Sequence, residues 1–227
     1  MGGVNGAGGA TGGATGTGGA GVGGMNGTGG APGCGPGNCA NGCCAGGGCI
    51  TATSAQQCGR GGAACTACGG CQLCAASGAC AIDPASSWII RCASAELTVT
   101  PPTGATWDPA GVAGDGTQPD PFCQFERPPG TVSATTAAAT RTVNDSFTAT
   151  WNQTVTPGTS TITAADLMAA NADTWRVWVG DNENNGRGTL ACQVRPPLSA
   201  SALVAGQSTV TNLASCVSLT LTLVCQP

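Results

Sequence analysis

The stretch Val217-Ser-Leu-Thr-Leu-Thr-Leu-Val224 decides the fold of this chain. Large apolar and hydroxyl residues alternate along it, and this period of two residues is typical of a β-strand with one buried face and one solvent-exposed face. Similar runs occur upstream, separated by Pro and Gly. They are Trp88–Val99, Phe122–Arg127, Val132–Val143, Trp151–Thr156, Thr174–Gly180 and Leu190–Arg195. Only Ala164–Asn171 has a helical pattern. We therefore predict an all-β fold, an eight-stranded antiparallel β-sandwich over residues 87–227.

Two segments without a strand pattern precede this region. Residues 1–33 hold 17 Gly and no charge, so we predict a disordered Gly-rich linker, with a packed polyglycine-helix bundle as the alternative. Residues 34–86 form a cysteine-rich segment, with 11 Cys between residues 34 and 80. Ile50 and Leu73 are the only large apolar side chains between those residues. Cross-links must therefore hold any fold there, and we predict a small disulfide-rich module.

Composition excludes several classes of function. The chain has 227 residues, 16 Cys and no His, and all seven of its basic residues are Arg. Without His the chain lacks the usual general base, and without Lys it cannot form a Schiff base. A net charge of -4 without a basic cluster argues against nucleic acid as a partner. The cysteine count indicates an oxidising compartment, extracellular or cell-surface. Because no signal peptide begins at Met1, we expect the export signal to lie upstream of it.

The cysteines are expected to form disulfides. The spacing of Cys65, Cys68, Cys71 and Cys74 leaves an all-thiolate zinc site or an iron–sulfur cluster as alternatives. Eleven cysteines in one segment and five in the next require a bridge between the two segments.

Two pairing schemes are open for that bridge. In the first, Cys92 makes the bridge to the module. In the second, Cys123 pairs with Cys192, Cys92 pairs with Cys216 or Cys225, and the remaining one of these two reaches the module. Cys216 and Cys225 cannot pair with each other, because an extended strand would hold them roughly 30 Å apart.

Acidic residues gather in two loop phrases. The first, TWDPAGVAGDGTQPDPF from Thr106 to Phe122, holds Asp108, Asp115 and Asp120. The second, WRVWVGDNEN from Trp175 to Asn184, holds Asp181 and Glu183. Carboxylates on two neighbouring loops are the oxygen ligands that a hard cation such as Ca²⁺ requires.

The order of four phrases resembles that of C2 domains, the calcium- and lipid-binding sandwiches of protein kinase C and synaptotagmin. These phrases are IIRCASAELTV (89–99), PDPFC (119–123), TATWNQ (148–153) and VGDNE (179–183). The resemblance implies a C2-like sandwich with Asp120 and either Asp108 or Asp115 as ligands in loop one, and Asp181 and Glu183 as ligands in loop three.

The chain departs from the family in three places. Asp108 lies 12 residues before Asp120, about twice the gap in the family; Glu183 replaces an Asp; and Asn184 and Asn185 leave the last loop-three acid without a counterpart. The alternative is therefore a set of loops that needs no ion, in which Asp120 fixes the conformation of a turn.

The cysteine-rich segment has a resemblance of its own. Its phrases CANGCCAGGGC (39–49) and QQCGRGGAACTAC (56–68) resemble modules in secreted proteins of myxobacteria-like soil bacteria. This resemblance implies a secreted location and says little about chemical function.

Together these patterns predict a secreted or cell-surface, non-enzymatic binding or structural module, stabilised by calcium and monomeric, with an unknown extracellular ligand. The alternative function is a calcium-dependent lipid- or glycan-binding effector, and a hydrolase ranks third. Membrane binding is not expected, because Arg141 is the only charge in the strand run from residue 132 to 141. Trp107 is the one candidate for an exposed aromatic; we expect Trp88, Trp151, Trp175 and Trp178 to be buried.

Overall fold

The computed structural model describes residues 33–101, 103–104, 106–107, 118–127, 137–155, 162–182 and 190–226. The chain divides into two compact units, Met1–Gly33 and Cys34–Pro227. The finer division of the second unit at residue 86 stays a prediction, and the predicted linker, apart from Gly33, lies outside the described residues. In the described part of the chain, no helix is long and apolar enough to cross a bilayer.

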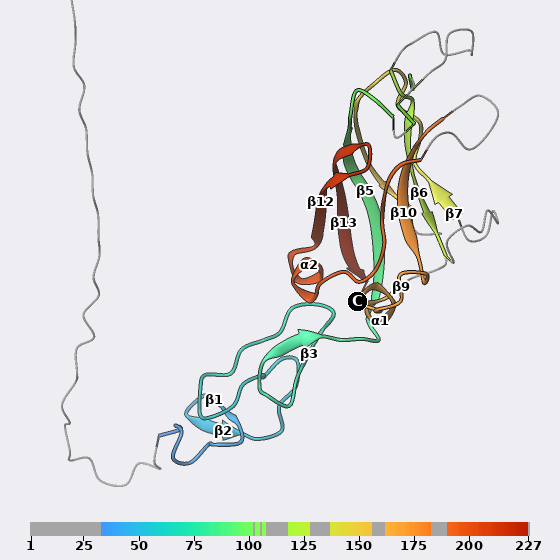
Figure 1. Ribbon diagram of the computed structural model, residues 1–227. Coiled ribbons are helices and arrows are strands. Elements are labelled where there is room, and N and C mark those ends of the chain that lie inside the picture. Colours follow the sequence, from blue (N-terminus) through green and yellow to red (C-terminus); the bar gives the residue numbers. More distant parts are fainter. Residues whose placement is uncertain are drawn as a thin grey trace, which may run out of the picture. The chain divides into compact units, whose positions relative to one another are not determined.

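Two antiparallel sheets pack face to face and confirm the predicted all-β sandwich (Figure 1). The first sheet has the order β12-β13-β5-β8, with β9 also paired to β5, and the second has the order β11-β10-β6-β7. The first sheet comprises β12 (Gln207–Leu213), β13 (Cys216–Gln226), β5 (Ser87–Leu97), β8 (Thr148–Thr154) and β9 (Ile162–Thr163). The second comprises β11 (Leu190–Val194), β10 (Arg176–Asp181), β6 (Pro121–Glu126) and β7 (Ala137–Ala139).

Strand β13 places its leucines in the core, as its alternation predicts. Leu219, Leu221 and Leu223 are 0–3% exposed, whereas the hydroxyl residues between them are partly exposed. In β5 the alternation shifts phase at a bulge between Cys92 and Ser94, so that Ile90 and Cys92 face inward before it and Ala95 after it.

Short helices and small hairpins complete the described fold. Helix α1 (Ala164–Leu167) begins at Thr163, whose hydroxyl accepts the Asp166 N–H, and it ends four residues before the predicted end at Asn171. Helix α2 (Ala200–Ala205) leads into β12; neither was predicted. The predicted strand Val132–Val143 is reduced to β7 among its described residues. In the cysteine-rich segment, β1 (Cys43–Ala45) pairs with β2 (Gly48–Ile50), and β3 (Gln72–Cys74) pairs with β4 (Cys80–Ile82).

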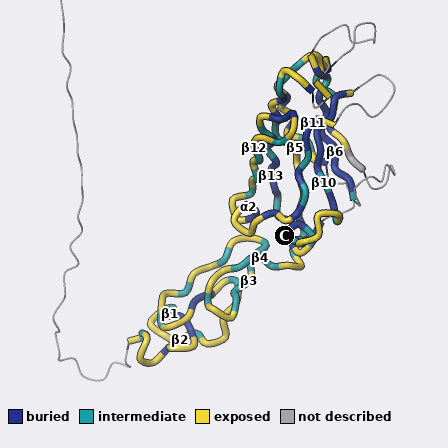
Figure 2. Tube along the Cα trace, in the orientation of Figure 1, coloured by how far each residue is buried: buried dark blue, intermediate teal, exposed yellow. Residues whose placement is uncertain are grey.

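Cystines take the place of a hydrophobic core in the cysteine-rich segment. Its only buried residues from 34 to 80 are Cys39, Gly42, Cys43, Cys58 and Gly59, so most of the tube there is teal or yellow in Figure 2. A Cβ at Gly42 would overlap the Ile50 carbonyl oxygen, because the backbone closes tightly around the bridges. This agrees with the expectation that covalent links hold the segment.

All 16 cysteines are bridged. Five bridges lie within the cysteine-rich segment: 34–44, 39–49, 43–65, 58–74 and 68–80. Cys71–Cys225 links that segment to the last strand, while Cys92–Cys123 and Cys192–Cys216 join the two sheets across the core. Cys216 and Cys225 do not pair, as predicted.

The first open scheme was wrong, and the second was right only in letting Cys225 reach the cysteine-rich segment, where it pairs with Cys71. Cys92 does not reach the cysteine-rich segment, because it points inward from β5 toward Cys123 on the opposite sheet. Cys123 does not pair with Cys192, because both lie on the second sheet, on β6 and β11, with β10 between them.

Candidate metal centre

Asp120 and Asp181 meet at one end of the sandwich. Strands β6 and β10 are antiparallel, and Asp181 pairs with Pro121, so the residue before β6 lies beside the last residue of β10. The Ser215 N–H donates to the Ala191 carbonyl, which places the β12–β13 turn at this same end. Cys225 lies at the other end of β13, roughly 30 Å away at about 3.3 Å per residue. The acidic end and the Cys71–Cys225 bridge are therefore at opposite ends of the first sheet.

The two acidic residues are connected through the backbone. The Asp120 N–H donates to Asp181 Oδ1 at 2.6 Å, across 61 residues of sequence. The Asn182 N–H donates in return to the Asp120 carbonyl at 3.0 Å. Asp181 is fully buried, at 0% exposure, whereas Asp120 is partly exposed. The two predicted acidic phrases thus converge at these two residues.

A third loop, which the sequence analysis did not include, joins this pair. The Asp145 N–H donates to Asp120 Oδ1 at 2.7 Å, and the Ser146 N–H donates to the Pro119 carbonyl at 2.8 Å. Asp145 itself is exposed and has a positive φ of 48°, a conformation that Asn and Asp adopt more readily than most residues. The turn phrase Asn144-Asp145-Ser146 was the available signal, but neither acidic phrase includes it.

The three other predicted ligands, Asp108, Asp115 and Glu183, lie outside the described residues. Their ligand roles, and those of Asp120 and Asp181, stay predictions. The observed hydrogen bonds are also what the ion-free alternative requires, because each carboxylate caps a loop N–H. What favours a cation is the number of acidic residues at this end: backbone hydrogen bonds join the loops of Asp120, Asp145 and Asp181, and a hard cation would offset the repulsion between their charges.

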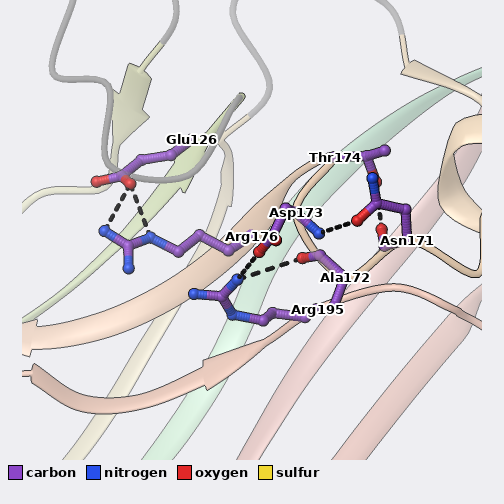
Figure 3. A network of polar contacts seen from close by, with 7 residues as sticks. All are labelled: Glu126, Asn171, Ala172, Asp173, Thr174, Arg176 and Arg195. Atoms are coloured by element: carbon purple, nitrogen blue, oxygen red, sulfur yellow. Dashed lines mark hydrogen bonds and ion pairs between the residues drawn. The ribbon is translucent and has the colours of Figure 1, made fainter.

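A second fully buried carboxylate lies elsewhere in the sandwich. Glu126, 0% exposed, forms an ion pair with Arg176 at 2.7 Å (Figure 3). Its Oε1 also accepts the Trp178 indole N–H at 2.9 Å. This pair lies at the far end of β6 and β10 from Asp181, since Arg176 is in register with Glu126. Its charges are balanced within the protein, so it is not a metal-site candidate.

The four cysteines whose spacing allowed a zinc or iron–sulfur site as an alternative belong to four different disulfides. Cys65, Cys68, Cys71 and Cys74 pair with Cys43, Cys80, Cys225 and Cys58. Sulfur atoms do approach within 4.8 Å in two groups, Cys34–Cys39–Cys44 and Cys58–Cys68–Cys80. All six of these sulfurs belong to bridges, so none offers a thiolate in the oxidised chain.

Trp107 does not provide an exposed aromatic platform. It is 2% exposed, and its indole N–H donates to the Thr98 carbonyl at 3.0 Å, so its ring packs in the core. The other four tryptophans are buried as expected. Trp178, however, lies outside the main core cluster, where it meets Phe122 edge to face at 5.0 Å.

No family model matches the chain, and no curated protein matches it. Among solved structures it is similar to human GIVD cytosolic phospholipase A2 in complex with a fluorophosphonate inhibitor and terbium chloride (TM-score 0.39, 12% identity, 62% of this chain and 17% of that chain). It is also similar to the calcium-bound tandem C2 domains of Extended-Synaptotagmin 2 (TM-score 0.39, 12% identity, 63% and 46%). A single C2 domain of plant Extended Synaptotagmin 1 gives a TM-score of 0.39 at 14% identity, over 63% of this chain and 96% of that chain. Likeness at this level assigns neither a family nor a function to the chain.

Proposed function

We propose that the chain is a secreted or cell-surface, non-enzymatic binding module whose acidic loop end holds a calcium ion. The observation that carries this proposal is the hydrogen bond from the Asp120 backbone N–H to the fully buried Asp181 carboxylate, which joins two acidic loops that lie far apart in the sequence. Eight disulfides support an oxidising setting, where free calcium is plentiful.

The described residues fit a calcium ion in part. Asp120 and Asp181 supply hard oxygen ligands from two loops, and loop carbonyls are ordinary calcium ligands as well. One oxygen of each carboxylate accepts a backbone N–H, so these bonds hold the side chains in place. A bound ion would offset the repulsion between the charges of the acidic residues at this end. The predicted ligands Asp108, Asp115 and Glu183 would complete the set.

Calcium is expected to stabilise the protein. Extracellular modules bind calcium with dissociation constants on the order of 10⁻⁴–10⁻³ M, and an excess of about 100-fold over that constant contributes roughly 2.7 kcal/mol. For a chain of this size the melting temperature should rise by about 5–10 °C. Differential scanning calorimetry with calcium or with chelator measures this rise.

The Asp181→Asn variant distinguishes a calcium-binding site from a set of loops that needs no ion. Asparagine keeps an oxygen that can accept the Asp120 N–H but removes the charge, so the variant should lose the calcium response without losing stability in chelator. Glu96→Gln, on an exposed position of β5, is the matched control and should keep the full response. An unmodified protein that melts at the same temperature with and without calcium would leave Asp120 and Asp181 as turn caps only.

A calcium-dependent lipid-binding effector is the second candidate function. Three exposed apolar residues lie close to Ser215 along the backbone at the acidic end: Val99 (77% exposed) and Leu190 (40%) adjoin Thr98 and Ala191, which bond to Ser215, and Val217 (42%) follows it by two residues. Such side chains beside a bound cation are suited to an anionic membrane surface. Sedimentation with phosphatidylserine vesicles tests this: pelleting that needs calcium and is lost in Val99→Asp supports it, and no pelleting rejects it.

A further inference from the structure

A second site, far from the acidic end, lies where the cysteine-rich segment meets the sandwich. A cavity of about 300 Å³ opens there, between the turn at residues 69–72, strands β5 and β13, and helix α2. Its walls include Ile82, Trp88, Leu203 and Leu223, each less than 10% exposed. An apolar cavity of about 150 Å³ is already large enough to bind benzene, so this one has room for a substituted ring.

The walls of the cavity are fixed by covalent and hydrogen bonds. Cys225 lines it, and its bridge to Cys71 ties the turn to the end of β13. The Asp83 N–H donates to the Cys71 carbonyl at 2.9 Å, and the Leu223 N–H donates to the Gly206 carbonyl at 2.8 Å. Because its walls are held in this way, the cavity needs no rearrangement to accept a ligand.

The turn adds hydrogen-bond donors to this apolar lining. Gln72 accepts the Gly69 N–H with its side-chain oxygen at 2.8 Å, which leaves the side-chain NH₂ group as a donor. Gly70 also lines the cavity, and within the described residues its N–H makes no hydrogen bond. The Trp88 indole N–H is already bonded to the Ser86 hydroxyl at 2.9 Å, so the ring acts as an apolar wall.

The lining also excludes charged ligands. None of the residues around the cavity is ionisable, and an ion without a counter-charge is costly to move from water to such a site. Val204 lines the cavity and is 62% exposed, so an apolar side chain stands where the cavity meets solvent. The site is therefore suited to a neutral molecule with a hydrocarbon body and one acceptor.

We propose that this cavity binds small neutral molecules that combine an aromatic or branched hydrocarbon body with a carbonyl or hydroxyl acceptor. The apolar body contacts Trp88, Ile82 and Leu223, and the acceptor takes a hydrogen bond from the Gly69–Gln72 turn. The site is independent of the proposed calcium centre, which lies at the other end of the first sheet.

Acetophenone and its near-isostere α-methylstyrene, which replaces the carbonyl oxygen with a methylene group, test the proposal by ¹H–¹⁵N NMR titration of the full chain. Acetophenone should produce saturable shifts at the Gly70 amide, the Gln72 side chain and the Trp88 indole, with a dissociation constant on the order of 10⁻³ M. α-Methylstyrene should bind about 2–10-fold more weakly, the value of one hydrogen bond. Equal binding of the two probes would reject the donor role of the turn.

Val204→Trp should block the opening and weaken acetophenone binding about tenfold or more, with no loss of fold because position 204 is exposed. Val99→Trp makes the same change at an exposed valine at the other end of the sheet and should bind acetophenone normally. Absence of saturable shifts at the cavity in the unmodified protein, or equal binding by Val204→Trp, would overturn the proposal.

Discussion

Replacing Arg176 with Met is expected to lower the free energy of unfolding by about 3–5 kcal/mol, because it removes the cation that pairs with the buried Glu126. Glu126 has no exposed surface, and Arg176 is its partner at 2.7 Å. Urea unfolding of the disulfide-intact protein measures the loss. The double variant Glu126→Gln with Arg176→Met should recover much of it, since it removes both charges together.

Arg195→Met is the matched control; Arg195 directly follows β11, the strand that pairs with β10, and Figure 3 shows both arginines with their partners. Arg195 pairs with Asp173 at 3.0 Å, but the Asp173 side chain is 80% exposed, so this pair should contribute about 0–1 kcal/mol. If Arg176→Met costs no more than Arg195→Met, the buried pair does not contribute as its geometry indicates.

Mild reduction should unfold the cysteine-rich segment while the sandwich stays folded. Five bridges hold that segment, and at roughly 2–5 kcal/mol each their combined loss is as large as, or larger than, the roughly 5–15 kcal/mol by which ordinary domains are stable. Both cysteines of each sandwich bridge, Cys92–Cys123 and Cys192–Cys216, are 0–2% exposed, so a thiol reductant cannot reach them. Every bridge within the cysteine-rich segment has at least one cysteine that is not buried. Hydrogen exchange should show lost protection across residues 34–82 and retained protection in β5 and β13.

Alkylation followed by mass spectrometry gives the matching chemical readout. The cysteines of residues 34–80 and Cys225 should be labelled, and the four sandwich cysteines should be labelled only after denaturant is added. Equal labelling of all cysteines without denaturant, or a cysteine-rich segment that keeps its protection when reduced, would contradict the structure.

The strands could be predicted because burial on one face leaves a periodic signal. Val217–Val224 and Trp88–Val99 carried it, and both form long strands. Strand β12 was missed because it is an edge strand with mostly polar, partly exposed residues, so no apolar face marks it. The bulge in β5 also cannot be read from alternation alone, since it shifts the phase within one apolar run.

The cysteine pairs could not be predicted, because they depend on which strands lie on opposite sheets. Cys92 and Cys123 face each other across the core, whereas Cys123 and Cys192 share a sheet. For the site, the meeting of Asp120 and Asp181 followed from two acidic loops that flank strands. The contribution of Asp145 did not, because a positive φ in a short turn gives a weak sequence signal.

A calcium titration followed by ¹H–¹⁵N NMR tests the central claim, calcium at the acidic end, most directly. The amides of Asp120, Asp145 and Asn182 take part in the bonds that connect the loops there, so they report on any ion bound by the carboxylates. We predict saturable shifts at these amides, with a dissociation constant on the order of 10⁻⁴–10⁻³ M, and their loss in Asp181→Asn. Unchanged positions of these amides at millimolar calcium, or shifts that persist in Asp181→Asn, would contradict the claim.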